Sequence, residues 1–196
     1  VLNQVCGDYA AWQKEIADPG MVAINLSLKE LSQASFIPHC RSVFEKHGVS
    51  PSRVELEITE TTLMLDAERT LPLLDELRAM GVHLSIDDFG TGYSSLSALQ
   101  QFPIGTLKID QSFVRNAAGD PDDATIVRTI IEMGRSLGLQ VLAEGIETEE
   151  QRSFLLKSGC QFGQGRLFGA PVSADEFLEM VLRQATGKHP ILRVPA

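Results

Sequence analysis

Two adjacent aspartates are the feature of this sequence that most directly indicates chemistry. Asp87 and Asp88 follow the alternating apolar run that ends at Ile86, and Gly90 and Gly92 come soon after them. Neighbouring carboxylates repel each other at neutral pH, and a folded protein accepts them most readily when a cation lies between or beside them. A helix N-cap would explain one aspartate but not both. The pair therefore predicts a cation site.

Polar side chains also lie at or just after the ends of the remaining strand-like segments of the chain. They are Asn25, Glu57 with Glu60, Lys108 with Asp110, Glu144 with Glu147, and Gln164. A single charged residue in such a place is most simply a solvated loop residue, but six strand ends with this property are harder to explain in that way. Carboxylate and amide oxygens are ligands for Mg²⁺ or Mn²⁺, whereas zinc prefers the histidines and paired cysteines that this pattern lacks.

Such a group of side chains suits the hydrolysis of a phosphate ester. Two metal ions about 3.5–4 Å apart would activate the attacking water and stabilise the leaving oxygen. Because consecutive side chains of a strand point to opposite sides, one aspartate of the pair can bridge both ions while its neighbour binds only the second. Lys108 would add a proton donor or a fixed positive charge, and together with Glu144 it would orient the water. Thr91 and the glycines on either side of it would let the next loop fold tightly.

Strand-like and helix-like segments alternate along the whole chain. The apolar runs that read as strands cover residues 21–27, 53–59, 82–88, 106–110, 140–147 and 160–168. Helix-like segments cover residues 1–17, 36–48, 66–81, 94–101, 122–137, 148–159 and 173–185. This alternation is typical of an α/β fold with a parallel sheet.

Two α/β architectures accommodate such a series: an open doubly wound sheet and most of an eight-stranded barrel. An open sheet concentrates its site at one switch point, whereas a barrel brings the carboxyl ends of all its strands to one mouth. The polar residues at nearly every strand end therefore favour a (β/α)8 TIM-like barrel, missing its first strand in this chain. We expect one barrel domain over residues 1–186 and a tail without regular structure over residues 187–196.

Composition narrows the functional class. The chain has 196 residues and a formal net charge of -9, which argues against a surface that follows long nucleic acid. No apolar run is long enough to predict a membrane span. The three cysteines, Cys6, Cys40 and Cys160, show no pairing pattern, which favours a reducing, cytoplasmic setting. Because Val1 is followed at once by a helix-like segment, we expect further sequence upstream.

Several motifs resemble the EAL-domain family of cyclic di-GMP phosphodiesterases, and they occur in the family's order over residues up to about 182. They are "INLS", "ELEITE", "SIDDFGTGYSSL", "LKIDQSFV", "AEGIET" and "GQGRLFGAP". The resemblance implies a (β/α)8 barrel that hydrolyses cyclic di-GMP to linear pGpG with Mg²⁺ or Mn²⁺, in bacterial second-messenger signalling.

The resemblance also implies which residues form the metal site. Asn25, Glu57 and Asp87 would bind the first ion, and Asp87 with Asp88 would bind the second. Glu144 would lie at the same site, where it and Lys108 would position the catalytic water and Glu144 would act as the general base.

Further roles follow from the same resemblance. Gln164 would lie at the metal or substrate end of the site, and Arg166, which stands where the family often has tyrosine, would supply a phosphate or base contact. Glu60 and Glu147 would support the loop formed by Gly90, Thr91 and Gly92. This loop and its neighbouring helices contribute to dimer interfaces in the family, so the resemblance implies a homodimer.

Departures from the family leave other functions open. The Glu-Ala-Leu strand that names the family is absent, and Gly105 replaces an aspartate in the "PIG" stretch. A receptor or regulatory module that binds cyclic di-GMP without cleaving it is one alternative. A scaffold or dimerisation unit with exposed sheet edges is another. Relatives also carry upstream sensor or diguanylate cyclase-like domains, and the domain could belong to a membrane-anchored sensor.

Overall fold

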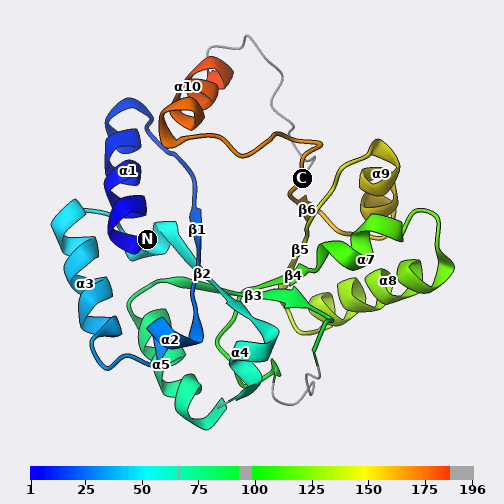
Figure 1. Ribbon diagram of the computed structural model, residues 1–196, viewed down its shortest axis with the longest axis horizontal. Helices are drawn as coiled ribbons and strands as arrows, with labels where there is room; N and C mark the ends of the chain where they lie inside the picture. Colours follow the sequence, from blue (N-terminus) through cyan, green and yellow to red (C-terminus); the bar gives the residue numbers. More distant parts are fainter. Residues whose placement is uncertain (66, 93–98, 186–196) are drawn as a thin grey trace.

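Six parallel strands form a single sheet in the computed structural model, which describes residues 1–65, 67–92 and 99–185 (Figure 1). The strands are β1 (Val22–Asn25), β2 (Val54–Thr59), β3 (His83–Phe89), β4 (Thr106–Ile109), β5 (Gln140–Ala143) and β6 (Phe162–Gly163). Their order in the sheet is the order in the sequence, without a reversal. A doubly wound sheet requires such a reversal, so the strand order confirms the barrel-type α/β fold.

Helices surround the strands in Figure 1, as expected when each right-handed crossover returns to the same face of a curled sheet. The helical elements are α1 (Leu2–Glu15), α2 (Leu28–Leu31), α3 (Phe36–His47), η1 (Pro51–Arg53), α4 (Glu60–Leu65), α5 (Ala67–Ala79), α7 (Gln111–Asn116), α8 (Pro121–Ser136), α9 (Glu149–Lys157) and α10 (Ala174–Ala185). Local sequence explains several of their ends. Asp120 accepts hydrogen bonds from the backbone at the start of α8, and Gly48 ends α3 in a left-handed conformation, at φ 65°.

The two faces of the sheet have opposite chemistry. On β2, Val54, Leu56 and Ile58 are buried in the apolar core that the helices cover. The residues between them, Glu55 and Glu57, are also buried, but they contact polar side chains of β4, which lies beyond β3 in the sheet. Because side chains alternate along a strand, one face of the sheet builds the hydrophobic core and the other builds a polar interior.

The main predicted elements agree with the structure, and the differences are local. The last predicted strand, over residues 160–168, is reduced to Phe162–Gly163, and the short helices α2, α4 and α7 were not predicted. The helix predicted over residues 94–101 falls largely outside the described residues, as does the tail over residues 187–196. Within the described part of the chain, no helix combines the length and apolar character that a membrane crossing requires.

Candidate active site

A buried lysine joins the carboxylates of three other strands or strand ends. The Lys108 Nζ lies 2.7 Å from Glu57 Oε1, 2.9 Å from Asp87 Oδ1 and 2.6 Å from Glu144 Oε1. The Lys108 side chain is 3% exposed, and those of its three partners are 10–14% exposed. Parallel strands β2, β3, β4 and β5 bring these residues together at their carboxyl ends, which is where barrel folds hold their sites.

Negative charge exceeds positive charge at this point. Burial raises the pKa of both Glu57 and Glu144, while the Lys108 ammonium opposes that rise and the Asp87 carboxylate adds to it. Burial alone would lower the pKa of Lys108, but hydrogen bonds to Glu144, Glu57 and Asp87 raise it above its ordinary value. Lys108 is therefore a permanent cation at neutral pH, yet one positive charge faces three carboxyl groups.

Asp88 joins the same cluster through an irregularity in β3. The pairing of β3 with β4 shifts register between Ile86 and Phe89, and Asp88 has φ 53°, in the left-handed region. One carboxylate oxygen from each of Asp87, Asp88 and Glu144 lies within 4.8 Å of the others. The prediction that the two aspartates point to opposite sides is therefore wrong, because the bulge turns Asp88 out of the regular alternation.

Asp110 is a polar strand-end residue that lies next to this cluster but was not predicted as one of the metal ligands. Burial raises the pKa of Asp88, and the nearby carboxyl groups of Asp87 and Asp110 raise it further. Asp110 also caps α7, since its Oδ1 accepts a hydrogen bond of 2.9 Å from the backbone of Ser112. Its position at the end of β4 was visible in the sequence, but the cap alone explains an aspartate there.

Asn25 and Gln164 lie at the ends of the first and last described strands. Asn25 is exposed and pairs in register with Glu57, so the structure places it beside the cluster. Gln164 follows β6, and its Nε2 donates a hydrogen bond of 2.6 Å to Glu144 Oε1. Arg166 is exposed in the turn that follows. The structure thus brings Gln164 into contact with the cluster and leaves Arg166 facing solvent.

Glu60 holds the loop after β3. Its Oε2 accepts hydrogen bonds from the backbone N–H groups of Gly90, at 2.9 Å, and Gly92, at 3.2 Å, and the residue is 2% exposed. Gly90 has φ 100°, and a Cβ there would lie 2.8 Å from Phe113 Cε2. The loop therefore requires glycine at this position, for backbone conformation and for space.

The other two residues predicted for this loop differ in their contacts. Thr91 Oγ1 donates a hydrogen bond of 2.8 Å to the backbone oxygen of Asp88, so it ties the loop to the aspartate pair. Glu147 is exposed, and its backbone N–H donates to Gln151 Oε1 at 2.7 Å. No hydrogen bond joins its side chain to residues 90–92 in the described structure, while residues 93–98 of the loop lie outside it.

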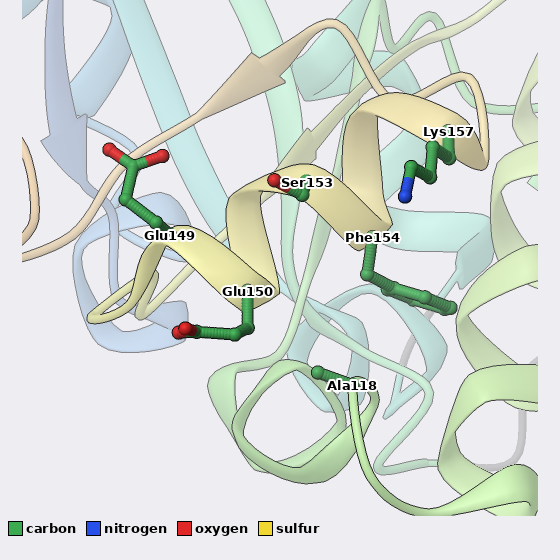
Figure 2. Close-up of a pocket in the computed structure, with 6 residues that line it drawn as sticks. All are labelled: Ala118, Glu149, Glu150, Ser153, Phe154 and Lys157. Atoms are coloured by element: carbon green, nitrogen blue, oxygen red, sulfur yellow. The ribbon is translucent and has the colours of Figure 1, made fainter.

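A surface pocket of about 450 Å³ lies away from this cluster, between α9 and the residues that precede α8 (Figure 2). Ala118, Glu150 and Phe154 are among its lining residues, and Figure 2 shows the Phe154 ring directed toward the neighbouring helix. The Arg128 guanidinium carbon lies 5.1 Å from the centroid of that ring. None of the strand-end residues lines this pocket, so it is separate from the candidate site.

The fold and the site together define a class: a parallel βα-barrel domain with an oxygen-rich acidic site at the carboxyl ends of its strands. The profile of the EAL domain family matches residues 1–171. The chain belongs to the EAL domain family.

Two proteins of Pseudomonas aeruginosa illustrate the sequence similarity. The bifunctional diguanylate cyclase/cyclic di-GMP phosphodiesterase MucR is 43% identical over 181 residues, which are 92% of this chain and 26% of MucR. The cyclic di-GMP phosphodiesterase NbdA is 40% identical over 181 residues, which are 91% of this chain and 23% of NbdA. The chain thus spans about a quarter of the length of these curated relatives.

Solved structures support the same family. The structure of the MucR phosphodiesterase in complex with cyclic di-GMP matches with a TM-score of 0.86 at 43% identity, covering 89% of this chain and 71% of that one. A Klebsiella pneumoniae BlrP1 complex with manganese and cyclic di-GMP matches with a TM-score of 0.78 at 31% identity, covering 87% and 44%.

Proposed function

We propose that this chain hydrolyses cyclic di-GMP to linear pGpG with the help of Mg²⁺ or Mn²⁺. The observation that carries the proposal is the convergence of Glu57, Asp87 and Glu144 on the Lys108 amine, in a member of the EAL domain family. Its relatives MucR and NbdA are named as cyclic di-GMP phosphodiesterases, and the BlrP1 complex contains manganese with cyclic di-GMP.

The donor atoms of the cluster fit a hard divalent cation. They are carboxylate oxygens, they lie within 4.8 Å of one another in Asp87, Asp88 and Glu144, and they carry an excess of negative charge. In this proposal Asn25, Glu57 and Asp87 would hold one ion, Asp87 and Asp88 would hold a second, and Glu144 would lie at the same site. When bound, the ions supply Lewis-acid activation of the attacking water and stabilise the leaving oxygen.

Glu144 is the proposed general base. Burial raises the pKa of its carboxyl group, which brings the group nearer to the range in which a base both exists deprotonated and accepts a proton. Gln164 Nε2 and Lys108 Nζ both donate to Glu144 Oε1, at 2.6 Å each, and so fix the carboxylate in one orientation. The water oxygen forms a bond to phosphorus as its proton passes to Glu144. One phosphorus–O3′ bond breaks, the O3′ oxygen keeps the bonding electron pair and takes a proton from solvent, and the products are a 5′-phosphate and a 3′-hydroxyl.

Lys108 contributes a fixed positive charge. Its ammonium is held at the centre of the cluster by hydrogen bonds from three directions, so it costs no reorganisation when charge develops on the phosphate. Gln164 and Arg166 follow β6 at the same end of the sheet, and we assign them to substrate binding. Glu60, with Glu147, would keep the loop of residues 90–92 in place. A homodimer, a cytoplasmic location and an upstream sensor or cyclase-like domain complete the proposal.

The test is the conversion of cyclic di-GMP to pGpG by the purified chain with Mn²⁺, followed by chromatography. Glu144→Gln removes the base and should lower turnover by about 10²–10⁴-fold while cyclic di-GMP still binds in a calorimeter. Glu149→Gln is the matched control, because Glu149 is 63% exposed and pairs only with Arg152 among the described residues. Turnover by Glu144→Gln at the wild-type rate would refute the assignment. Binding without turnover by the wild-type chain would instead identify a receptor.

A further inference from the structure

A layer of buried polar side chains lies directly below the acidic site, toward the amino ends of the strands. Its members are Glu55, Ser85 and Thr106, which are 7%, 0% and 8% exposed. Each precedes a member of the acidic site by two residues on the same strand, so it faces the same side of the sheet. The two layers lie one above the other on the same face of the sheet.

Ser85 lies at the centre of this lower layer. In the strand register it stands opposite Glu57 on β2 and Thr106 on β4. Its Oγ is fully buried and has no hydrogen-bond partner among the described residues. Thr106, by contrast, is paired: its Oγ1 donates a hydrogen bond of 3.1 Å to Glu55 Oε2.

Buried hydroxyl groups are almost always hydrogen-bonded. A hydroxyl buried without a partner loses its hydrogen bonds to water and forms none in the protein, which destabilises the folded state. An orphaned hydroxyl among apolar residues would be replaced at little cost by alanine. In the strand register Ser85 instead stands beside two residues that can bond a small polar molecule, Glu57 and Thr106. Thr106 Oγ1 retains lone pairs after donating to Glu55, and the Glu57 carboxylate, which binds Lys108 through Oε1, has further lone pairs.

We propose that Ser85 Oγ binds an internal water molecule that it shares with Thr106 Oγ1 and the Glu57 carboxylate. An internal water requires two to four polar partners, and these three groups supply them. The water donates to Glu57 from below while the Lys108 amine donates to Glu57 from within the acidic site. Ser85 is thereby a positioning residue: it restricts the Glu57 carboxylate to the orientation in which Glu57 holds Lys108.

This inference deepens the proposed metal site, and it rests on that proposal only for its effect on metal binding. A Glu57 carboxylate that is fixed from both sides is preorganised to bind an ion, whereas a free one loses side-chain entropy on binding. The water site itself stands on the burial and register of Ser85. Its effect on stability is therefore measured without metal.

The experiment uses Ser85→Ala, with the melting temperature measured in the absence of metal and the affinity for Mn²⁺ alone measured by calorimetry. We expect the melting temperature to fall by about 2–4 °C. We expect the dissociation constant for Mn²⁺ to rise by about 10-fold. Ser136→Ala is the matched control, because the Ser136 hydroxyl is exposed on α8 and donates to the backbone of Glu132. That control should leave the affinity for Mn²⁺ unchanged.

A double variant tests whether Ser85 and Thr106 share the water. In a Thr106→Val background, Ser85→Ala should lower the melting temperature by less than it does in the wild-type chain, since the shared molecule is already lost. Equal falls in the two backgrounds would overturn the shared site.

The remaining outcomes are equally decisive. A melting temperature of Ser85→Ala that equals or exceeds that of the wild type would show an orphaned hydroxyl and overturn the water site. A lower melting temperature with unchanged Mn²⁺ affinity would overturn the positioning role. If the wild-type chain binds Mn²⁺ but releases no pGpG, the proposed hydrolysis fails while the results for Ser85 still stand.

Discussion

Replacing Lys108 by methionine removes the cation that the described residues place in the middle of the acidic cluster. Glu57, Asp87 and Glu144 each lie within 2.9 Å of the Lys108 Nζ, and their side chains are only 10–14% exposed. Removing one partner of a buried ion pair costs about 3–5 kcal/mol, because the remaining charge is buried without compensation. For a chain of this length, that loss lowers the melting temperature by about 6–20 °C.

The measurement is thermal unfolding in the presence of a chelator, with Lys157→Met as the control that makes the same change of charge on an exposed residue. Adding Mn²⁺ should restore part of the stability of Lys108→Met, since a bound divalent cation replaces the missing charge and stabilises the folded state by mass action. Equal melting temperatures for the two variants without metal would refute the reasoning, because the carboxylates would then not depend on Lys108.

Three further changes probe the site and its loop. Burial raises the pKa of Asp88 above its ordinary value of 3.8, so this carboxyl contributes stability that is present below pH 3.8 and is lost as the pH rises through its folded pKa. In Asp88→Asn, the free energy of unfolding, measured by urea titration without metal, should fall less steeply as the pH rises over this range. An unchanged dependence of this free energy on pH would contradict the prediction. Glu60→Ala leaves two backbone N–H groups of the loop without their acceptor and should cost about 1–3 kcal/mol in the same assay, with Glu60→Gln recovering part of the loss. Gly90→Ala forces a Cβ to 2.8 Å from Phe113 at a positive φ and should cost about 1–3 kcal/mol, whereas Gly169→Ala, with no atom within 4 Å of its added Cβ, is the neutral control; equal stability of the two alanine variants would rule out the steric argument.

The main strands and helices of the fold follow from sequence patterns that physical chemistry makes reliable. Each main strand has a continuous or alternating apolar pattern, and helices such as α3 end at a glycine that adopts the left-handed conformation. The short helices were not predictable in the same way. α7 has six residues, too few for an apolar period to emerge, and its start depends on the Asp110 cap.

The candidate site was predictable in its membership more than in its geometry. The carboxyl ends of parallel strands converge, so the polar residues there were expected to meet, and Glu57, Asp87 and Glu144 do meet at Lys108. The conformation of Asp88 was not predictable, because a register shift between two strands is a property of their pairing and not of either segment alone. The buried layer around Ser85 was not predicted for a related reason. The role of a serine inside an apolar run depends on which residues lie beside it on the adjacent strands, and the strand's own sequence does not show them.

The central claim is that these carboxylates bind divalent metal ions, and anomalous diffraction from crystals soaked in Mn²⁺ tests it most directly. The account predicts anomalous peaks within about 2.6 Å of oxygens from Asp87 and from Asp88 or Glu57. Crystals that contain Mn²⁺ only at other positions, with Lys108 still bonded to all three carboxylates, would contradict it.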